Sequence, residues 1–255
     1  MEPTQTYDPV GQCIYCGSTS NLSDEHIIPY GLHGNVVLPA ASCPDCAKIT
    51  TKLEQYIQRR MLGPIRLHFN LQTRRPKERP DVLGAEVLID NKFKLVDVPR
   101  SEFPTWLWMF DLDTPGILRD DPSGNIRAKG YTLIPIADDI IEKVRRVGGG
   151  EAVSIMPINP GLLCRFLAKV AHAYAVAEYG IDGFRPLLPD LILGDLSQAG
   201  YLVGGQRAPR DDTRNALHYV GARFEKNNGD ELAVISVHLF AFLETPVYQV
   251  AAGFR

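Results

Sequence analysis

Apolar residues in the first quarter of the chain change from strand-like to helical spacing. Residues 22–28 and the run at 36–38 predict two short strands, separated by a loop that contains Gly31. After residue 43 the apolar positions recur every three or four residues, which predicts a helix that ends at Gly63-Pro64. These positions are Ile49, Leu53, Tyr56, Ile57 and Met61. The expected order is strand, loop, strand, helix.

The remainder of the chain predicts an α+β fold with mostly antiparallel strands. Residues 85–98 read as two strands joined near Asp90-Asn91, and a helix is expected from Pro160 to about Gly180. Asn228-Gly229 is a typical hairpin turn near the end of the chain. Further strands are expected at 106–112, 131–136, 217–225, 232–243 and 246–254. We expect the C-terminal strands to form a sheet that packs on the helix at 160–180.

Composition is that of a globular protein, with 45% apolar and 22% charged residues and a net charge of −3. The longest uncharged C-terminal stretch, residues 232–243, is too short to span a bilayer. The first ten residues lack the basic and apolar regions of a secretory signal. The expectation is a cytoplasmic protein with no membrane partner.

Charge is unevenly distributed along the chain. Residues 1–46 contain five acids and no Lys or Arg, whereas residues 47–80 contain nine basic residues and two acids. Such a run is either a solvated linker or a surface for phosphate contacts. The candidate nucleic-acid contacts are Arg59, Arg60, Arg66, Arg74, Arg75, Lys77 and Arg79.

Four of the five cysteines form two C-x-x-C pairs, with 26 residues between the pairs. Two such pairs can supply the four thiolates of a tetrahedral structural Zn²⁺ site. Disulfides are the alternative, but nothing in the sequence indicates export to an oxidising compartment. The predicted zinc ligands are Cys13, Cys16, Cys43 and Cys46, while Cys164 is expected to be a buried apolar residue.

At roughly residues 11–62, the chain resembles the HNH family of ββα-metal endonucleases, in the branch with a four-cysteine zinc site. The matching text is CIYCG, then DEHIIPYGLHGN, then CPDC at the start of a helix. The resemblance implies metal-dependent hydrolysis of phosphodiester bonds. It also implies that His26 is the general base and Glu25 the ligand of a catalytic Mg²⁺ or Mn²⁺, with Asp24 as the alternative.

The chemistry requires such residues independently, because a neutral imidazole can deprotonate water and a carboxylate can hold a hard divalent cation. Adjacent strand residues point to opposite faces, so Glu25 and His26 need a local distortion to serve one site. A histidine that only caps the loop and a solvated glutamate are the alternatives.

Two positions depart from the family pattern. Ala47 stands where His or Asn usually supplies another metal ligand, and the next turn offers only Thr50 or Thr51. Leu38 stands where many members have the asparagine that orients the base, so Asn35 is the candidate replacement. His33 lies in the loop between the strands and is a further candidate for contact with phosphate or metal.

These observations predict three parts: a zinc-containing HNH-like module at 1–63, a basic linker at 64–80 and an α+β domain at 81–255. The partner implied is nucleic acid, with DNA favoured, in a defence or mobile-element setting that rests on analogy of architecture alone. The α+β domain would sense, position or assemble the nuclease. An oligomer formed through this domain is a further possibility. The alternative function is a catalytically inactive, zinc-stabilised binding module.

Overall fold

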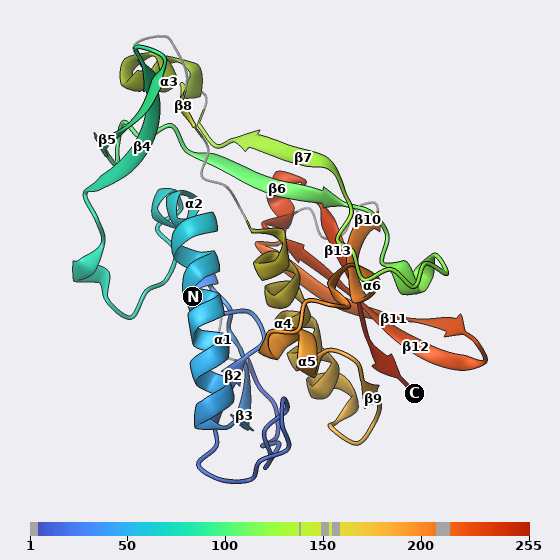
Figure 1. Ribbon diagram of the computed structural model, residues 1–255. Coiled ribbons are helices and arrows are strands. Elements are labelled where there is room, and N and C mark those ends of the chain that lie inside the picture. The colour runs from blue at the N-terminus through green and yellow to red at the C-terminus, as the bar shows by residue number, and fades with distance from the viewer. Residues whose placement is uncertain (1–4, 138, 149–152, 155–158, 208–214) are drawn as a thin grey trace.

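The computed structural model describes residues 5–137, 139–148, 153–154, 159–207 and 215–255, and it is mixed α+β with small antiparallel sheets (Figure 1). The N-terminal part contains β1 (Gln5–Thr6), β2 (Ser23–His26), β3 (Val36–Ser42) and α1 (Pro44–Tyr56). Strand β3 is central, with β1 parallel to it on one side and β2 antiparallel on the other. The predicted order of strand, loop, strand and helix is confirmed, whereas β1 was not expected.

The first helix is followed directly by a π-helical turn and a second helix. A π-helical turn at Ile57–Met61 follows α1. A further helix, α2 (Gly63–His68), begins at the Gly63-Pro64 pair that was expected to end the first helix. Proline is tolerated in the first turn of a helix because the N–H it lacks has no partner there. The helical run that starts with α1 therefore ends immediately before Gly63-Pro64, as predicted, and the same dipeptide starts a second helix.

The largest sheet has the order β10-β13-β12-β11, and β9 (Arg185–Pro186) pairs with β13. The expected hairpin turns through Asn228 and Gly229, which both have positive φ. Helix α4 (Pro160–Tyr179) packs against β12 and β13, as predicted. The sheet strands are β10 (Val203–Arg207), β11 (His218–Asn227), β12 (Asp230–Leu239) and β13 (Val247–Phe254). Two short helices, α5 (Pro189–Leu193) and α6 (Ala199–Leu202), precede them.

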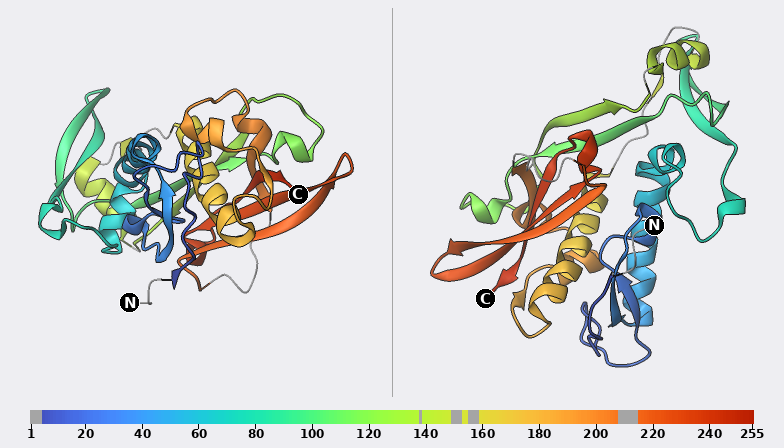
Figure 2. Two further views of the ribbon diagram at one scale, coloured as in Figure 1. Left: turned by 90° about the horizontal axis from the view of Figure 1, so that it is seen from below. Right: turned by 180° about the vertical axis from the view of Figure 1, so that it is seen from behind.

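A smaller β structure extends away from the large sheet. The predicted hairpin forms β4 (Val82–Ile89) and β5 (Lys92–Pro99), and β4 also pairs with β8 (Val153–Ser154). Helix α3 (Ile140–Gly148) packs against β4. The long hairpin of β6 (Trp106–Leu112) and β7 (Ala128–Pro135) runs between this end and the large sheet (Figures 1 and 2).

Helix α4 occupies the centre of the molecule, between α1 and the large sheet (Figures 1 and 2). One hydrophobic cluster runs from Cys13 in the N-terminal part to Ala252 in β13. Ile65 and Leu71, which lie in the predicted linker, are buried in the same cluster. Among the described residues, every helix is too short or too polar to cross a membrane.

Candidate functional site

The four cysteines of the two C-x-x-C pairs converge at the base of the β2–β3 hairpin. Their sulfur atoms all lie within 4.8 Å of one another, and the Sγ atoms of Cys16 and Cys43 are 3.6 Å apart. A zinc ion with Zn–S bonds of about 2.3 Å holds its sulfur atoms about 3.8 Å from each other in a tetrahedron. The cluster can therefore hold a structural metal ion such as zinc.

The surroundings of this cluster favour the thiolate at Cys43, whereas burial raises the pKa of Cys46. A backbone N–H of Cys46, helped by the neighbouring thiols, lowers the pKa of Cys43 to about 7. Cys43 is the N-cap of α1, so the cluster joins the loop before β2 to the start of the helix. Cys164 is buried in α4, and burial raises the pKa of its thiol to about 12, as expected for an inert core residue.

Strand β2 directs its polar side chains to opposite faces. Asp24 is exposed and His26 is half-buried, whereas Glu25 between them is only 7% exposed. The Asp24 carboxylate accepts a hydrogen bond from the backbone N–H of Ala40 at 3.3 Å. The register of β2 against β3 shifts between Ser23 and Glu25, so the strand is irregular at Asp24. Asp24 and His26 both reach the surface, whereas Glu25 points into the protein.

A lysine from α4 binds the Glu25 carboxylate inside the protein. Lys169 is fully buried, and its Nζ lies 2.7 Å from Glu25 Oε1 and 2.8 Å from Glu54 Oε1 of α1. It also donates a hydrogen bond to the backbone carbonyl of His26. Burial disfavours the charged ammonium, but the two carboxylates outweigh this effect and raise the pKa of Lys169. Burial also raises the pKa of Glu54.

The His26 imidazole lies next to an aromatic ring and a cation. Its ring centroid is 6.2 Å from that of Tyr30, edge to face, and the Arg74 guanidinium lies 5.8 Å from the Tyr30 centroid. Burial, followed by the charges of Lys169 and Arg74, lowers the pKa of His26. The imidazole is therefore neutral at physiological pH and can accept a proton.

The remaining candidates lie around this strand. Asn35 and His33 line a cavity of about 600 Å³ between the β2–β3 loop, α4 and β11. His33 is exposed, and its Nδ1 accepts a hydrogen bond from the Gln72 N–H at 3.2 Å. Thr51 is exposed on α1, whereas the Thr50 hydroxyl donates to the Ala47 carbonyl in its own helix. The Thr50 hydroxyl is therefore engaged within its own helix, and Thr51 faces solvent.

The basic run contains both bound and solvent-exposed side chains. Arg66 donates to the carbonyls of Gly31, Gln58 and Gln72, and Arg79 donates to that of Leu71. Burial lowers the pKa of Arg66, as expected for a guanidinium used inside the structure. Arg75 pairs with Glu78 at 3.2 Å. Of the seven candidate nucleic-acid contacts in the run, the exposed ones are Arg59, Arg60, Arg74, Arg75 and Lys77.

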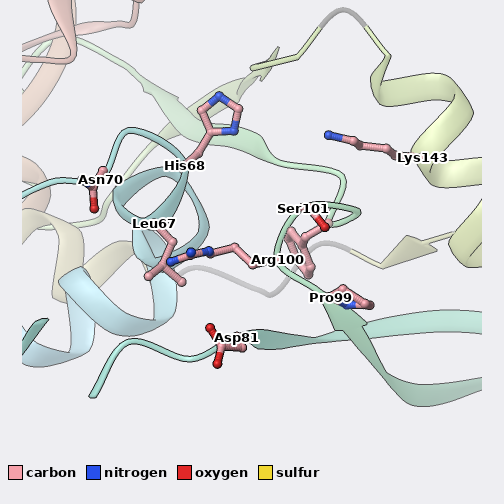
Figure 3. A pocket seen from close by; sticks show the side chains of 9 residues that line it. Leu67, His68, Asn70, Asp81, Pro99, Arg100, Ser101 and Lys143 are labelled. Carbon is pink, nitrogen blue, oxygen red and sulfur yellow. The ribbon is translucent and has the colours of Figure 1, made fainter. Parts of the chain in front are cut away.

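A second cavity, of about 660 Å³, adds basic groups that sequence reasoning did not select (Figure 3). His68 comes from the end of α2, Arg100 follows β5, and Lys143 comes from α3. Asp81 also lines the cavity, and Lys143 pairs with Asp139 at 3.4 Å. These groups come from three separate segments, so no local run of charge indicates them.

Lys169 was likewise not selected from the sequence. The available signal was a single lysine within the apolar stretch of α4, at a position that falls among buried residues. A lysine at such a position requires an internal anion, since a buried charge is unfavourable without a partner. The partner itself could not be identified from spacing.

Comparisons of the chain with known proteins identify no relative. The chain matches no protein-family model, and neither the curated proteins nor the solved structures give a match.

Proposed function

We propose that the protein is a metal-dependent endonuclease of the HNH type that hydrolyses phosphodiester bonds in nucleic acid, with DNA favoured. The observation that carries the proposal is the neutral, half-buried His26 on a hairpin that a four-cysteine cluster joins to α1. In this role His26 removes the proton from the attacking water, which requires a neutral imidazole at the working pH.

The carboxylates beside His26 differ in what they can hold. Asp24 is exposed two residues before His26, whereas the Glu25 carboxylate is bound to Lys169. A Mg²⁺ or Mn²⁺ ion, when bound, neutralises charge on the phosphate and the departing oxygen. Magnesium sites use one or two carboxylates together with substrate phosphate and water, and Asp24 fits that requirement.

Nucleic-acid binding is supported by the exposed cations near His26. Arg74 lies over the Tyr30 ring, which itself contacts the His26 imidazole, so a phosphate next to the cleavage centre can meet the guanidinium. Arg59 and Arg60 are exposed on the π-helical turn that follows α1. Arg100 and Lys143, which line the second cavity, offer further positive charge. Contacts of this kind give affinity without sequence preference.

A second candidate function is an inactive, zinc-stabilised binding module. Two observations favour it: Ala47 offers no metal ligand, and Lys169 occupies the carboxylate of Glu25. Both functions require nucleic acid to bind, but only the first requires His26 to react.

Cleavage assays on plasmid, single-stranded DNA and RNA with Mg²⁺, Mn²⁺, Co²⁺, Ni²⁺ or Zn²⁺ separate the two functions. His26→Ala should reduce cleavage roughly 10²–10⁴-fold while zinc content and nucleic-acid binding stay unchanged. Asp24→Asn should also reduce cleavage, with partial recovery at high metal concentration. Ala47→Asn or Ala47→His should raise activity if the site is weak for want of a ligand. Cleavage that survives His26→Ala would refute the mechanism, and binding without cleavage under every condition would favour the second function.

A further inference from the structure

The surroundings of Lys169 have the composition of a metal site. Oxygen atoms from two carboxylates and two backbone carbonyls face one nitrogen: Glu25 and Glu54, with the carbonyls of His26 and Ile27. Lys169 has no exposed surface, and the Glu25 and Glu54 side chains are 8% and 20% exposed. Carboxylate and carbonyl oxygens are also the ligands that hard divalent cations prefer.

The ligands come from separate elements, which makes the arrangement specific. Glu25 lies on β2, Glu54 two turns along α1 from the second cysteine pair, and Lys169 on α4. The ammonium group brings three N–H donors, and these suffice for the two carboxylates and the His26 carbonyl. The three side chains together carry a net charge of −1, so the internal cation offsets one of the two carboxylates.

We propose that the ε-ammonium of Lys169 takes the place of a divalent cation beside Glu25, so that Glu25 binds no metal ion in the native protein. A magnesium ion would have to lie about 2.1 Å from a Glu25 oxygen. The Lys169 ammonium already donates a hydrogen bond to Glu25 Oε1 at 2.7 Å. A magnesium ion and an ammonium group bound to the same carboxylate would repel each other strongly in a buried site. The inference deepens the proposed function, on which its catalytic meaning rests: the reactive ion then has Asp24, and not Glu25, as its carboxylate ligand.

Manganese binding to the zinc-loaded full chain tests the inference without nucleic acid, by the EPR signal of free Mn²⁺. Glu25→Gln should leave the Mn²⁺ affinity of the wild type unchanged, whereas Asp24→Asn should reduce it. Lys169→Met exposes two carboxylates to each other and should create a Mn²⁺ site at least roughly tenfold tighter than any in the wild type. The double variant Lys169→Met/Glu25→Gln should lose that site again.

Two results would overturn the inference: a wild-type affinity that falls about tenfold in Glu25→Gln, or no gained site in Lys169→Met. If Lys169→Met does not fold alone, its folding should be restored by Mn²⁺. The variant Lys169→Met/Glu54→Gln carries one fewer buried charge and should show the same Glu25-dependent gain, so a lack of gain there also overturns the inference. Because none of these measurements uses cleavage, they remain decisive if the nuclease proposal fails, and loss of that proposal does not change them.

Discussion

The ammonium of Lys169 lies 2.7 Å from the Glu25 carboxylate, and the same nitrogen reaches the His26 carbonyl, 143 residues away in sequence. This contact ties α4, the helix at the centre of the fold, to the strand that carries the candidate base. Removing one member of a buried ion pair leaves a buried charge without a partner. The contact is therefore a structural link between the N-terminal part and the remainder of the chain.

The first prediction concerns the stability that depends on this link. Lys169→Met should lower the free energy of unfolding by roughly 3–5 kcal/mol, because two buried carboxylates lose their cation. Urea denaturation of the zinc-loaded protein measures the change.

Two controls accompany this measurement. Lys94 makes an exposed ion pair with Asp90, so Lys94→Met should cost less than about 1 kcal/mol. The apolar replacement Glu25→Met/Glu54→Leu/Lys169→Met should recover most of the loss, since a buried ion cluster is often no more stable than well-packed apolar residues. Equal losses in Lys94→Met and Lys169→Met would contradict the role assigned to burial.

The second prediction concerns zinc. The protein as isolated should contain about one zinc ion per chain, because four thiolates can complete one tetrahedral site. Cys43→Ser should lose the ion and reduce protection from hydrogen exchange across residues 11–62, whereas Cys164→Ser should retain it. Elemental analysis and exchange measured by mass spectrometry provide the two readouts. An unchanged zinc content in Cys43→Ser would contradict the assignment.

The third prediction follows from His218, which connects β11 to the loop after β2. Its Nδ1 accepts from the Phe240 N–H at 3.1 Å, so its Nε2 carries the hydrogen that is donated to the Leu32 carbonyl at 2.7 Å. Protonation would place a hydrogen on Nδ1 and remove the first bond. Burial accordingly lowers the pKa of His218 to about 4.

The free energy of unfolding should therefore fall as the pH drops from about 6.5 toward 4, because His218 binds a proton in the unfolded chain but stays neutral in the folded protein. Each such group contributes a slope of about 1.4 kcal/mol per pH unit in that window. His218→Gln should reduce the slope of the free energy of unfolding by about that amount, as measured by urea denaturation at several pH values. A slope that does not change would show that His218 is not neutral in the folded protein.

The fourth prediction concerns nucleic-acid binding through the exposed arginines. Replacing Arg59, Arg60 and Arg74 with Gln should weaken binding and reduce the slope of log affinity against log salt by about two to three, if all three contact phosphate. Fluorescence anisotropy across a salt series measures both quantities. The charge-matched control replaces Lys92, Lys94 and Lys226, which are exposed on the β4–β5 and β11–β12 hairpins, and should leave the slope unchanged. Equal effects of the two sets would mean that only net charge matters.

Local patterns were sufficient for much of the fold. The strand–loop–strand–helix order, the turns at Asp90-Asn91 and Asn228-Gly229, and the long helix from Pro160 all formed where the sequence predicted them. Such elements depend on periodicity and turn residues within a few positions of each other. The four cysteines were equally readable, since C-x-x-C spacing fixes the geometry of each pair of thiols and the structure brings the two pairs together.

Local patterns were insufficient where a residue's environment comes from a distant element. The sequence placed Glu25 and His26 on opposite faces of a strand, but it could not show that Lys169 would bind Glu25 or that Glu54 would join them. Nor did it indicate that the Arg66 guanidinium donates its hydrogen bonds to backbone carbonyls. The sequence likewise did not indicate that Arg100 and Lys143 line one cavity.

The division has a physical reason. Residue types, spacing and alternation along the chain fixed which groups are available: four paired thiols, one imidazole that follows two carboxylates, and a set of cations. Packing of α4 between α1 and the large sheet decided which of these groups lost their water and gained a partner. Burial and pairing over long sequence separations depend on the whole tertiary structure, so the charge state and the availability of Glu25 and His26 were set there.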